Sequence, residues 1–267
     1  MLRYQLKLSK IINIYIFDFI IFNIYVFPKD QYSKKDQIYK GEIYTLSKNM
    51  TMSIQTEYKH YSIDNKIFKG YLAWDDSLNA ARPGVLVFPE WWGLNSYIQK
   101  RTEQVAELGY LAFGVDMYGE GKIADTPEEA GSLMNRVLED KQIIKARLEA
   151  AFNVLNEHAL SDSKRLGAIG YCFGGALVLN MARMGMDLRA VISFHGALDS
   201  FFSSAPGDIK AKVLVCHGEA DEFISKEAIE QFKSEMDTAG ADYEFISYQG
   251  AFHGFSNHAA DERGRKF

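Results

Sequence analysis

The chain has little cysteine and no excess of positive charge. Its 267 residues include two cysteines, and their spacing fits neither a disulfide framework nor a metal-binding motif. The net charge of -5 gives no reason to expect a nucleic-acid partner. Residues 53–267 also lack internal repeats, low-complexity tracts and linkers. What is present is an ordinary globular composition, 47% hydrophobic, in a segment long enough for one sizeable domain.

Residues 1–52 differ in kind and are expected to be an atypical N-terminal extension. Residues 11–27 form an apolar run preceded by basic residues, as in a signal peptide or a membrane anchor. The run is near the lower length limit for spanning a bilayer, and Asp18 in its middle would cost about 2.5–3.5 kcal/mol on insertion. Three interpretations stay open: an over-long start with Met50 or Met52 as the natural first residue, an anchor or uncleaved signal, and a genuine extra element.

The rest of the chain alternates between strand and helix patterns. Apolar and alternating runs predict strands at Ser53–Ile63, Lys66–Trp74, Val85–Phe88, Tyr110–Val115, Leu166–Ile169, Ala190–Phe194, Val213–Cys216 and Tyr243–Tyr248. The first two strands are joined at Asp64 and Asn65. Amphipathic stretches predict the helices, including one that begins after Thr126 with a capping-box Glu129. This alternation indicates an α/β fold with a mostly parallel central sheet and helices on both faces.

The most informative motif is Gly170-Tyr171-Cys172-Phe173-Gly174-Gly175. It stands between a strand pattern and a buried helix pattern, which is the setting of a nucleophile elbow. Glycine suits the two flanking positions because such a sharp turn has no room for Cβ atoms there. The central residue of the elbow is usually serine, and here it is Cys172. Taken alone, a cysteine beside glycines is more often a small buried residue.

Two later residues change the interpretation of Cys172. Asp221 follows one predicted strand, and His253 follows the next. The chain order is therefore nucleophile, acid and histidine, with the acid and the histidine just past strand ends. This is the order and placement of the triad in α/β-hydrolases.

From about residue 53 to its end, the chain resembles the dienelactone hydrolase family. The resemblance rests on the glycine elbow, on His217-Gly218-Glu219-Ala220-Asp221 and Phe252-His253-Gly254-Phe255, and on Phe88-Pro89-Glu90-Trp91-Trp92-Gly93-Leu94-Asn95. It implies an α/β-hydrolase fold over residues 53–267. In the family a final helix follows the histidine loop, whereas the tail 258–267 is polar and short. We therefore expect the C-terminal helix to be missing and the stability to be reduced.

The resemblance also implies how the site works. Cys172 would attack the carbonyl of a small ester or lactone and form an acyl-enzyme, with His253 as the base and Asp221 holding the histidine. The backbone N–H groups of Phe173 and Trp91 would form the oxyanion hole. No cofactor is expected. A thiol nucleophile favours a reducing compartment, so a cytoplasmic location is expected unless residues 1–52 are a signal or an anchor.

Further residues near these motifs are candidates for regulation and substrate binding. By resemblance, Glu90 partners the cysteine in the resting enzyme and moves away when substrate binds. Trp92, Tyr118 and Lys122 are candidate pocket residues. Trp91, Trp92 and Tyr118 are equally well explained as core aromatics. Two arginines that hold the carboxylate of dienelactone in the family are absent, and Asn257 stands at one of those positions. Dienelactone itself is therefore a doubtful substrate.

Several alternatives stay open at this point. Cys216 and His217 could join Asp221 and His253 in a zinc site, but the spacing is irregular and the triad explains Asp221 and His253 better, so no metal is expected. The chain could be a thioesterase acting on small acyl thioesters. It could also be a non-catalytic or truncated family member that acts as a binding protein. The oligomeric state and the natural substrate do not follow from the sequence.

Overall fold

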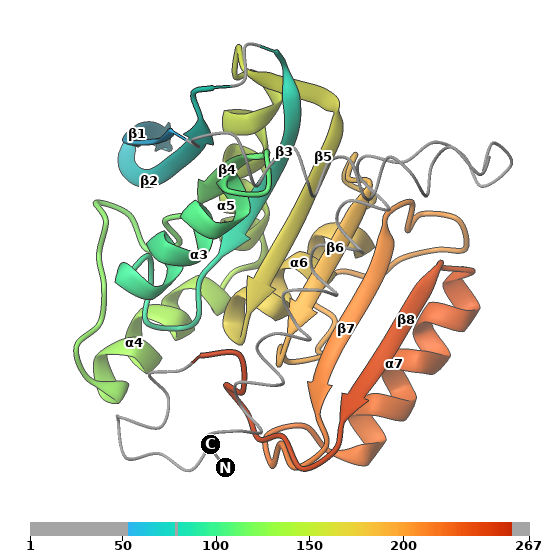
Figure 1. The fold of residues 1–267 in the computed structure, drawn as a ribbon. Coiled ribbons are helices and arrows are strands. Elements are labelled where there is room, and N and C mark those ends of the chain that lie inside the picture. The colour runs from blue at the N-terminus through green and yellow to red at the C-terminus, as the bar shows by residue number, and fades with distance from the viewer. Residues whose placement is uncertain (1–52, 78–79, 258–267) are drawn as a thin grey trace, which may run out of the picture.

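A twisted sheet organises the computed structural model, which describes residues 53–77 and 80–257 (Figure 1). The strand order is β1-β2-β4-β3-β5-β6-β7-β8. The strands are β1 Ile54–Ile63, β2 Lys66–Asp75, β3 Arg82–Phe88, β4 Leu111–Gly114, β5 Ser161–Tyr171, β6 Ala190–Phe194, β7 Lys212–Gly218 and β8 Tyr243–Tyr248. Strand β2 is antiparallel to both β1 and β4, and the strands from β4 to β8 are parallel. The expected α/β fold with a mostly parallel sheet is confirmed.

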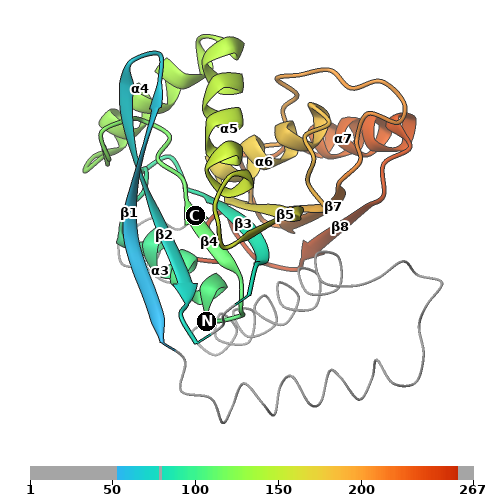
Figure 2. The same cartoon turned by 90° about the horizontal axis from the view of Figure 1, so that it is seen from above.

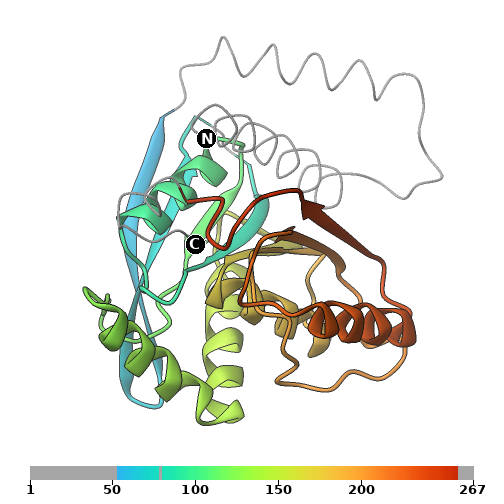
Figure 3. The ribbon, with the colours of Figure 1, turned by 90° about the horizontal axis from the view of Figure 1, so that it is seen from below.

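Helices lie on both faces of the sheet, as Figures 2 and 3 show. The helices are α3 Ser96–Ala106, α4 Pro127–Leu138, α5 Lys141–Asn156, α6 Phe173–Arg183 and α7 Lys226–Ala239. Helix α3 lies on one face, and α4, α5, α6 and α7 lie on the other. Alternate residues of a strand therefore pack against helices on opposite faces of the sheet. Val85 and Val87 of β3 pack with α3, whereas Leu86 and Phe88 pack with α5 and α6.

Local sequence explains the boundaries of these elements. Asp64 and Asn65, at the turn between β1 and β2, have φ of 48° and 62°, which is the backbone of a tight hairpin turn. The Thr126 hydroxyl accepts a hydrogen bond from the Glu129 N–H at 3.2 Å and so caps α4. Ser225 caps α7, and Gly240 ends it in the left-handed conformation. The predicted hairpin and the predicted helix start at Thr126 are confirmed.

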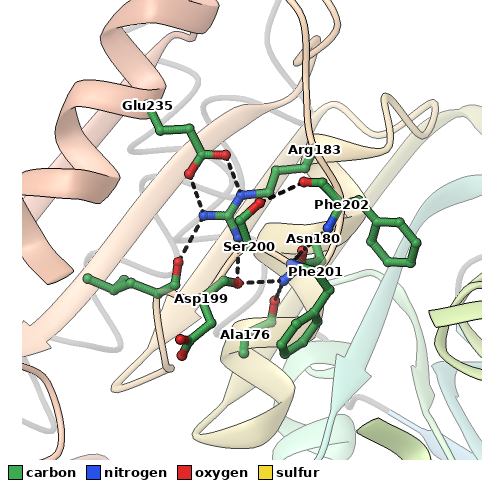
Figure 4. Close-up of polar contacts among 9 residues, drawn as sticks. Ala176, Asn180, Arg183, Asp199, Ser200, Phe201, Phe202 and Glu235 are labelled. Atoms are coloured by element: carbon green, nitrogen blue, oxygen red, sulfur yellow. Dashed lines mark hydrogen bonds and ion pairs between the residues drawn. The ribbon is translucent and has the colours of Figure 1, made fainter. Parts of the chain in front are cut away.

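An ion pair between a buried arginine and a half-buried glutamate fixes the segment that follows β6 (Figure 4). The guanidinium of Arg183 on α6 binds both carboxylate oxygens of Glu235 on α7, at 2.8 and 2.7 Å. The same group donates to the carbonyls of Leu198 and Asp199, each at 2.9 Å. Asn180, one turn earlier, accepts from the backbone beyond them. The loop after β6 is thereby attached to two helices, and its start is held at the carboxyl edge of the sheet.

The predictions about the two ends fall on residues 1–52 and 258–267, which lie outside the described residues. The proposed extension and the expected lack of a C-terminal helix therefore stay predictions. Within residues 53–77 and 80–257, no helix is long and apolar enough to cross a bilayer.

Candidate active site

Five polar residues follow the carboxyl ends of parallel strands. Glu90 comes after β3, Cys172 after β5, His195 after β6, Asp221 after β7 and His253 after β8. Because these strands are parallel, their carboxyl ends meet at one edge of the sheet (Figure 1). This edge is where open α/β sheets bind ligands.

Cys172 occupies a strained turn between β5 and α6. Its φ of 51° and ψ of -113° lie in a region that non-glycine residues seldom adopt and that is typical of functional sites. The backbone N–H donates to the carbonyl of Phe194 at 3.0 Å, which ties the turn to β6. A Cβ atom at Gly170 would lie 2.0 Å from the carbonyl oxygen of Gly174. The glycines are therefore required for α6 to begin so close to β5.

Asp221 and His253 form a hydrogen-bonded pair. The imidazole Nδ1 of His253 lies 2.8 Å from Oδ2 of Asp221, whose side chain is fully buried. The other carboxylate oxygen accepts from the backbone N–H of Phe223 at 3.0 Å. The two loops are also joined by their backbones, since the N–H of Ala220 donates to the carbonyl of Ala251 at 2.9 Å. The orientation of the carboxylate, and with it the position of Nδ1 of His253, is thus fixed.

The surroundings of His253 favour its protonated form. Burial by itself would lower the pKa of His253, but hydrogen bonds to Asp221 and to Cys172, with the charges of both groups, raise it to about 10. The structure thus joins His253 to Asp221, and the direction of the pKa shift favours the Cys172 thiol as a second partner of the imidazole.

The two predicted oxyanion donors lie in adjoining segments. Phe173 is the first residue of α6, where a backbone N–H has no partner inside its own helix. Trp91 lies in the loop after β3, and its carbonyl accepts a 2.7 Å hydrogen bond from the hydroxyl of Tyr118. The N–H of Gly174 donates to the carbonyl of Pro89 at 2.9 Å, which joins the start of α6 to that loop.

Glu90 is buried and bound by a residue from the histidine loop. Its Oε2 accepts a 3.0 Å hydrogen bond from Nδ2 of Asn257. From the sequence, Asn257 was notable only for standing where the resemblance called for an arginine. The structure shows that its amide holds the carboxylate of Glu90. A side chain occupied in this way is not free to bind a substrate carboxylate without releasing Glu90.

The three candidate pocket residues have different surroundings. Tyr118 is buried, and burial, followed by the charge of Cys172, raises the pKa of its phenol. Trp92 packs in a small apolar cluster with Ala124 and other residues beside α4. The ammonium of Lys122 is exposed and pairs with Glu120 at 2.8 Å. Their contact with a substrate stays a prediction, and that of Lys122 would require its ion pair to open.

The residues considered for a zinc site do not form one. Cys216 and His217 are successive residues of β7, so their side chains point to opposite faces of the sheet. Burial raises the pKa of the Cys216 thiol to about 12, which makes it an inert core thiol. In the part of the chain that the structure describes, no three His, Cys, Asp or Glu side chains are arranged to hold a metal ion.

Sequence reasoning missed three buried polar residues beside the histidine. His195 directly follows a predicted strand, and its ring lies 5.1 Å from the ring of His253. Ser256 and Arg101 were not considered. Arg101 lies on the buried face of α3 together with Ile98 and other apolar residues. An arginine on the apolar face of a predicted helix is the sequence signal that could have identified it. Nothing in the sequence singles out Ser256.

Comparison with known proteins gives one consistent result. The model of the dienelactone hydrolase family matches residues 68–265. The chain is 32% identical over 185 residues to Protein usf of Aquifex pyrophilus, covering 67% of this chain and 79% of that protein. It is 29% identical over 199 residues to a putative carboxymethylenebutenolidase of Aquifex aeolicus, covering 73% of this chain and 84% of that protein.

The fold agrees with the sequence match. A solved structure called m3DLH superposes with a TM-score of 0.74 at 36% identity, covering 79% of this chain and 88% of that chain. The strand order, the elbow at Cys172 and the loops that carry Asp221 and His253 are those of an α/β-hydrolase fold. The chain belongs to the dienelactone hydrolase family and is a hydrolase with the α/β-hydrolase fold.

Proposed function

We propose that this chain hydrolyses small carboxylic esters or lactones through an acyl-enzyme formed on Cys172. One observation carries the proposal: His253 is bonded to Asp221 at 2.8 Å, and Cys172, at the strained elbow on the same edge of the sheet, is among the groups that raise the pKa of His253. A nucleophile, a histidine and an orienting carboxylate within hydrogen-bond reach are the parts that acyl transfer requires.

Acylation begins with a thiolate on Cys172 and a protonated His253. The thiolate attacks the acyl carbon, and the electron pair of the carbonyl moves to its oxygen, where the N–H groups of Phe173 and Trp91 stabilise the charge. The tetrahedral intermediate then collapses, and the bond to the leaving oxygen breaks. His253 gives its proton to the leaving alkoxide, and a thioester remains on Cys172. Asp221 stabilises the imidazolium before this transfer.

Deacylation restores the starting state. Neutral His253 removes a proton from a water molecule as that water attacks the thioester carbonyl. The second tetrahedral intermediate expels the Cys172 thiolate and releases the carboxylic acid. His253 again carries a proton next to the thiolate, so no group is consumed in the cycle.

Glu90 has a regulatory role in this proposal. A carboxylate near the thiol opposes formation of the thiolate by like-charge repulsion. The bond from Asn257 keeps Glu90 in place in the ligand-free protein. Entry of substrate would displace this pair, and the Cys172 thiol would then pass its proton to His253, which gives the thiolate and protonated imidazole with which acylation begins.

The proposed substrate is small and need not carry a carboxylate. Asn257 is engaged by Glu90, and Lys122 is engaged by Glu120 on the surface. Neither residue therefore provides a fixed positive charge that could bind a substrate carboxylate. Short uncharged esters and lactones fit these surroundings better than dienelactone.

The test is hydrolysis of p-nitrophenyl acetate and butyrate. Cys172→Ala should lower kcat/KM by about 10³-fold or more, whereas Cys216→Ala, at the buried cysteine off the site, should retain most of the activity. Brief mixing with substrate should add one acyl mass to the peptide that contains Cys172. Full activity in Cys172→Ala would refute the proposal. Turnover of acyl thioesters alone would favour a thioesterase, and binding without turnover a non-catalytic protein.

A further inference from the structure

A group of buried polar side chains lies behind the histidine loop. Ser256, three residues after His253, is 1% exposed. Its hydroxyl is hydrogen-bonded to Nε2 of His195 at 2.8 Å. Its carbonyl accepts hydrogen bonds from the guanidinium of Arg101 and, at 3.2 Å, from the hydroxyl of Tyr97. One residue of an irregular loop is thus held through both its side chain and its backbone.

Arg101 is a buried cation whose bonds lead to this loop. It is 8% exposed, and besides the Ser256 carbonyl its donors reach the hydroxyl of Tyr97 at 3.2 Å and the amide of Gln104 at 3.1 Å. Its plane also lies over the ring of Tyr171, 5.7 Å from the centroid. These partners are neutral, and the negative charge of the buried Glu90 carboxylate also favours the charged guanidinium, so together they offset the cost of burying it. A residue of α3 therefore fixes a loop that lies 155 positions later in the chain.

His195 is the third residue of the group and is itself under strain. Its φ of 40° is unusual for a residue other than glycine. The strained backbone is held by a 2.8 Å hydrogen bond from its N–H to the carbonyl of Cys216. Its ring contacts the ring of His253 edge-on, with centroids 5.1 Å apart and planes at 64°, and that of Phe255 at 5.4 Å. Strain of this kind persists where the surroundings enforce it, and it is often found at functional sites.

The imidazole of His253 needs such support. Its bond to Asp221 fixes one ring nitrogen but leaves the ring free to rotate about the line of that bond. The loop from Tyr248 to Asn257 contains no helix or strand beyond the end of β8. Contacts from neighbouring elements must therefore set both the position of the loop and the plane of the ring.

We propose that Arg101, His195 and Ser256 form a positioning network that holds His253 in line with Cys172. Arg101 fixes the loop through the Ser256 carbonyl, Ser256 fixes His195, and the ring of His195 restricts the plane of His253. None of the three needs to touch the substrate. The inference rests on the proposed function in assigning catalysis to His253, but the geometry of the network does not depend on the substrate.

Ser256→Ala in the full chain is the mildest test because it removes one hydroxyl. It should lower kcat for p-nitrophenyl butyrate by about 10- to 100-fold, which is the scale of a small misplacement of a catalytic group, with KM within about twofold. Ser256→Thr, which keeps the hydroxyl, should recover most of the loss. Arg101→Met should act in the same direction.

Arg82→Met is the matched control for Arg101→Met. Arg82 is also a buried arginine that binds backbone carbonyls, those of Asp75 and Ala80, but it is the first residue of β3, at the opposite end of the strand from the site. It should lower the melting temperature without changing kcat at a temperature where the protein is folded. Equal losses of kcat in the two arginine variants would show a general structural effect and overturn the proposal, as would a kcat within twofold of wild type in Ser256→Ala.

A second readout separates this inference from the proposed function. The ¹⁵N and ¹³C signals of the His253 ring report its environment whether or not an ester is hydrolysed. If wild type and Cys172→Ala show the same low rate, the proposed function fails, and the network is judged by these signals alone. A His253 spectrum and titration in Ser256→Ala identical to those of wild type would overturn the network. A changed spectrum, restored in Ser256→Thr, would support it.

Discussion

Replacing Asp221 with asparagine tests the electrostatics of the site directly. Asparagine is nearly the same size and its amide oxygen can still accept from Nδ1 of His253, so the 2.8 Å contact need not be lost. What is lost is a buried negative charge beside an imidazole. The change therefore separates the charge of Asp221 from its role in orienting the ring.

The magnitude follows from the surroundings of His253. A pKa raised from 6.5 to about 10 corresponds to roughly 5 kcal/mol in favour of the protonated ring, at about 1.4 kcal/mol per unit. An opposite charge at hydrogen-bond distance accounts for about 1–3 units of such a shift. Removing this charge should therefore lower the pKa of His253 from about 10 to between about 7 and 9. The ring then loses its proton at lower pH, and deprotonation alone should lower kcat/KM at pH 8 by up to about 10-fold.

The assay is the pH dependence of kcat/KM for a simple alkyl ester such as ethyl butyrate, followed by titration of released acid. An alkoxide leaving group needs a proton, so the rate should fall when His253 deprotonates. Wild type should show this fall near pH 10, and Asp221→Asn should show it at least one unit lower. Titration of the His253 ring signals by NMR should show the same downward shift of its pKa. These signals must be distinguished from those of the neighbouring His195 and His217.

Glu219 supplies the control for this experiment. It lies in the same loop as Asp221, and its carboxylate accepts a 3.2 Å hydrogen bond from the backbone of Gly250, but it is exposed. In Glu219→Gln, both the pH at which kcat/KM falls and the pKa of His253 should be the same as in wild type. The reasoning would be refuted if the fall of kcat/KM in Asp221→Asn occurred at the same pH as in wild type, or if Glu219→Gln moved it as far as Asp221→Asn does.

The remaining predictions concern the elbow, the acidic gate and the N-terminal segment. Gly170→Ala should lower the free energy of unfolding in urea by more than about 3 kcal/mol because the new methyl group meets backbone; Gly207→Ala, where φ is 86° but nothing lies within 4 Å, should cost about 1–2 kcal/mol. Glu90→Gln should raise the rate of Cys172 alkylation by iodoacetamide about 3- to 10-fold if Glu90 opposes the thiolate, and an unchanged rate would argue against a gate. A chain that begins at Met52 should keep the melting temperature and esterase rate of the full chain, since the family match begins at residue 68; a clear loss of either would assign residues 1–51 to the folded domain.

Local signals in the sequence were sufficient for the elements and for the main motifs. The turn at Asp64 and Asn65, the cap at Thr126 and the left-handed stop at Gly240 each depend on the conformation of a few neighbouring residues. The elbow around Cys172 is of the same kind because glycine is required within one turn of the chain. Such features depend on consecutive residues, so they can be predicted without knowledge of distant contacts.

The partners of Glu90 and of the histidine loop could not be read in this way. Asn257 meets Glu90 across 167 positions of the chain, and Arg101 meets Ser256 across 155. In each case the pairing depends on the lateral order of strands in the sheet and on where α3 packs. Nothing in the local pattern around any of these residues contains that information.

The sequence by itself determined the alternation of strands and helices, the sharp turn at Cys172 and the order in which Cys172, Asp221 and His253 follow their strands. These depend on side-chain periodicity and on local backbone sterics, which act over a few residues. Only the tertiary structure decided that Asp221 binds His253, that Asn257 binds Glu90, and that Arg101 and His195 bind Ser256 in the loop of His253. The reason is burial. Once parallel strands bring their carboxyl ends together, each polar group at that edge loses water and must find a partner from whichever element packs against it.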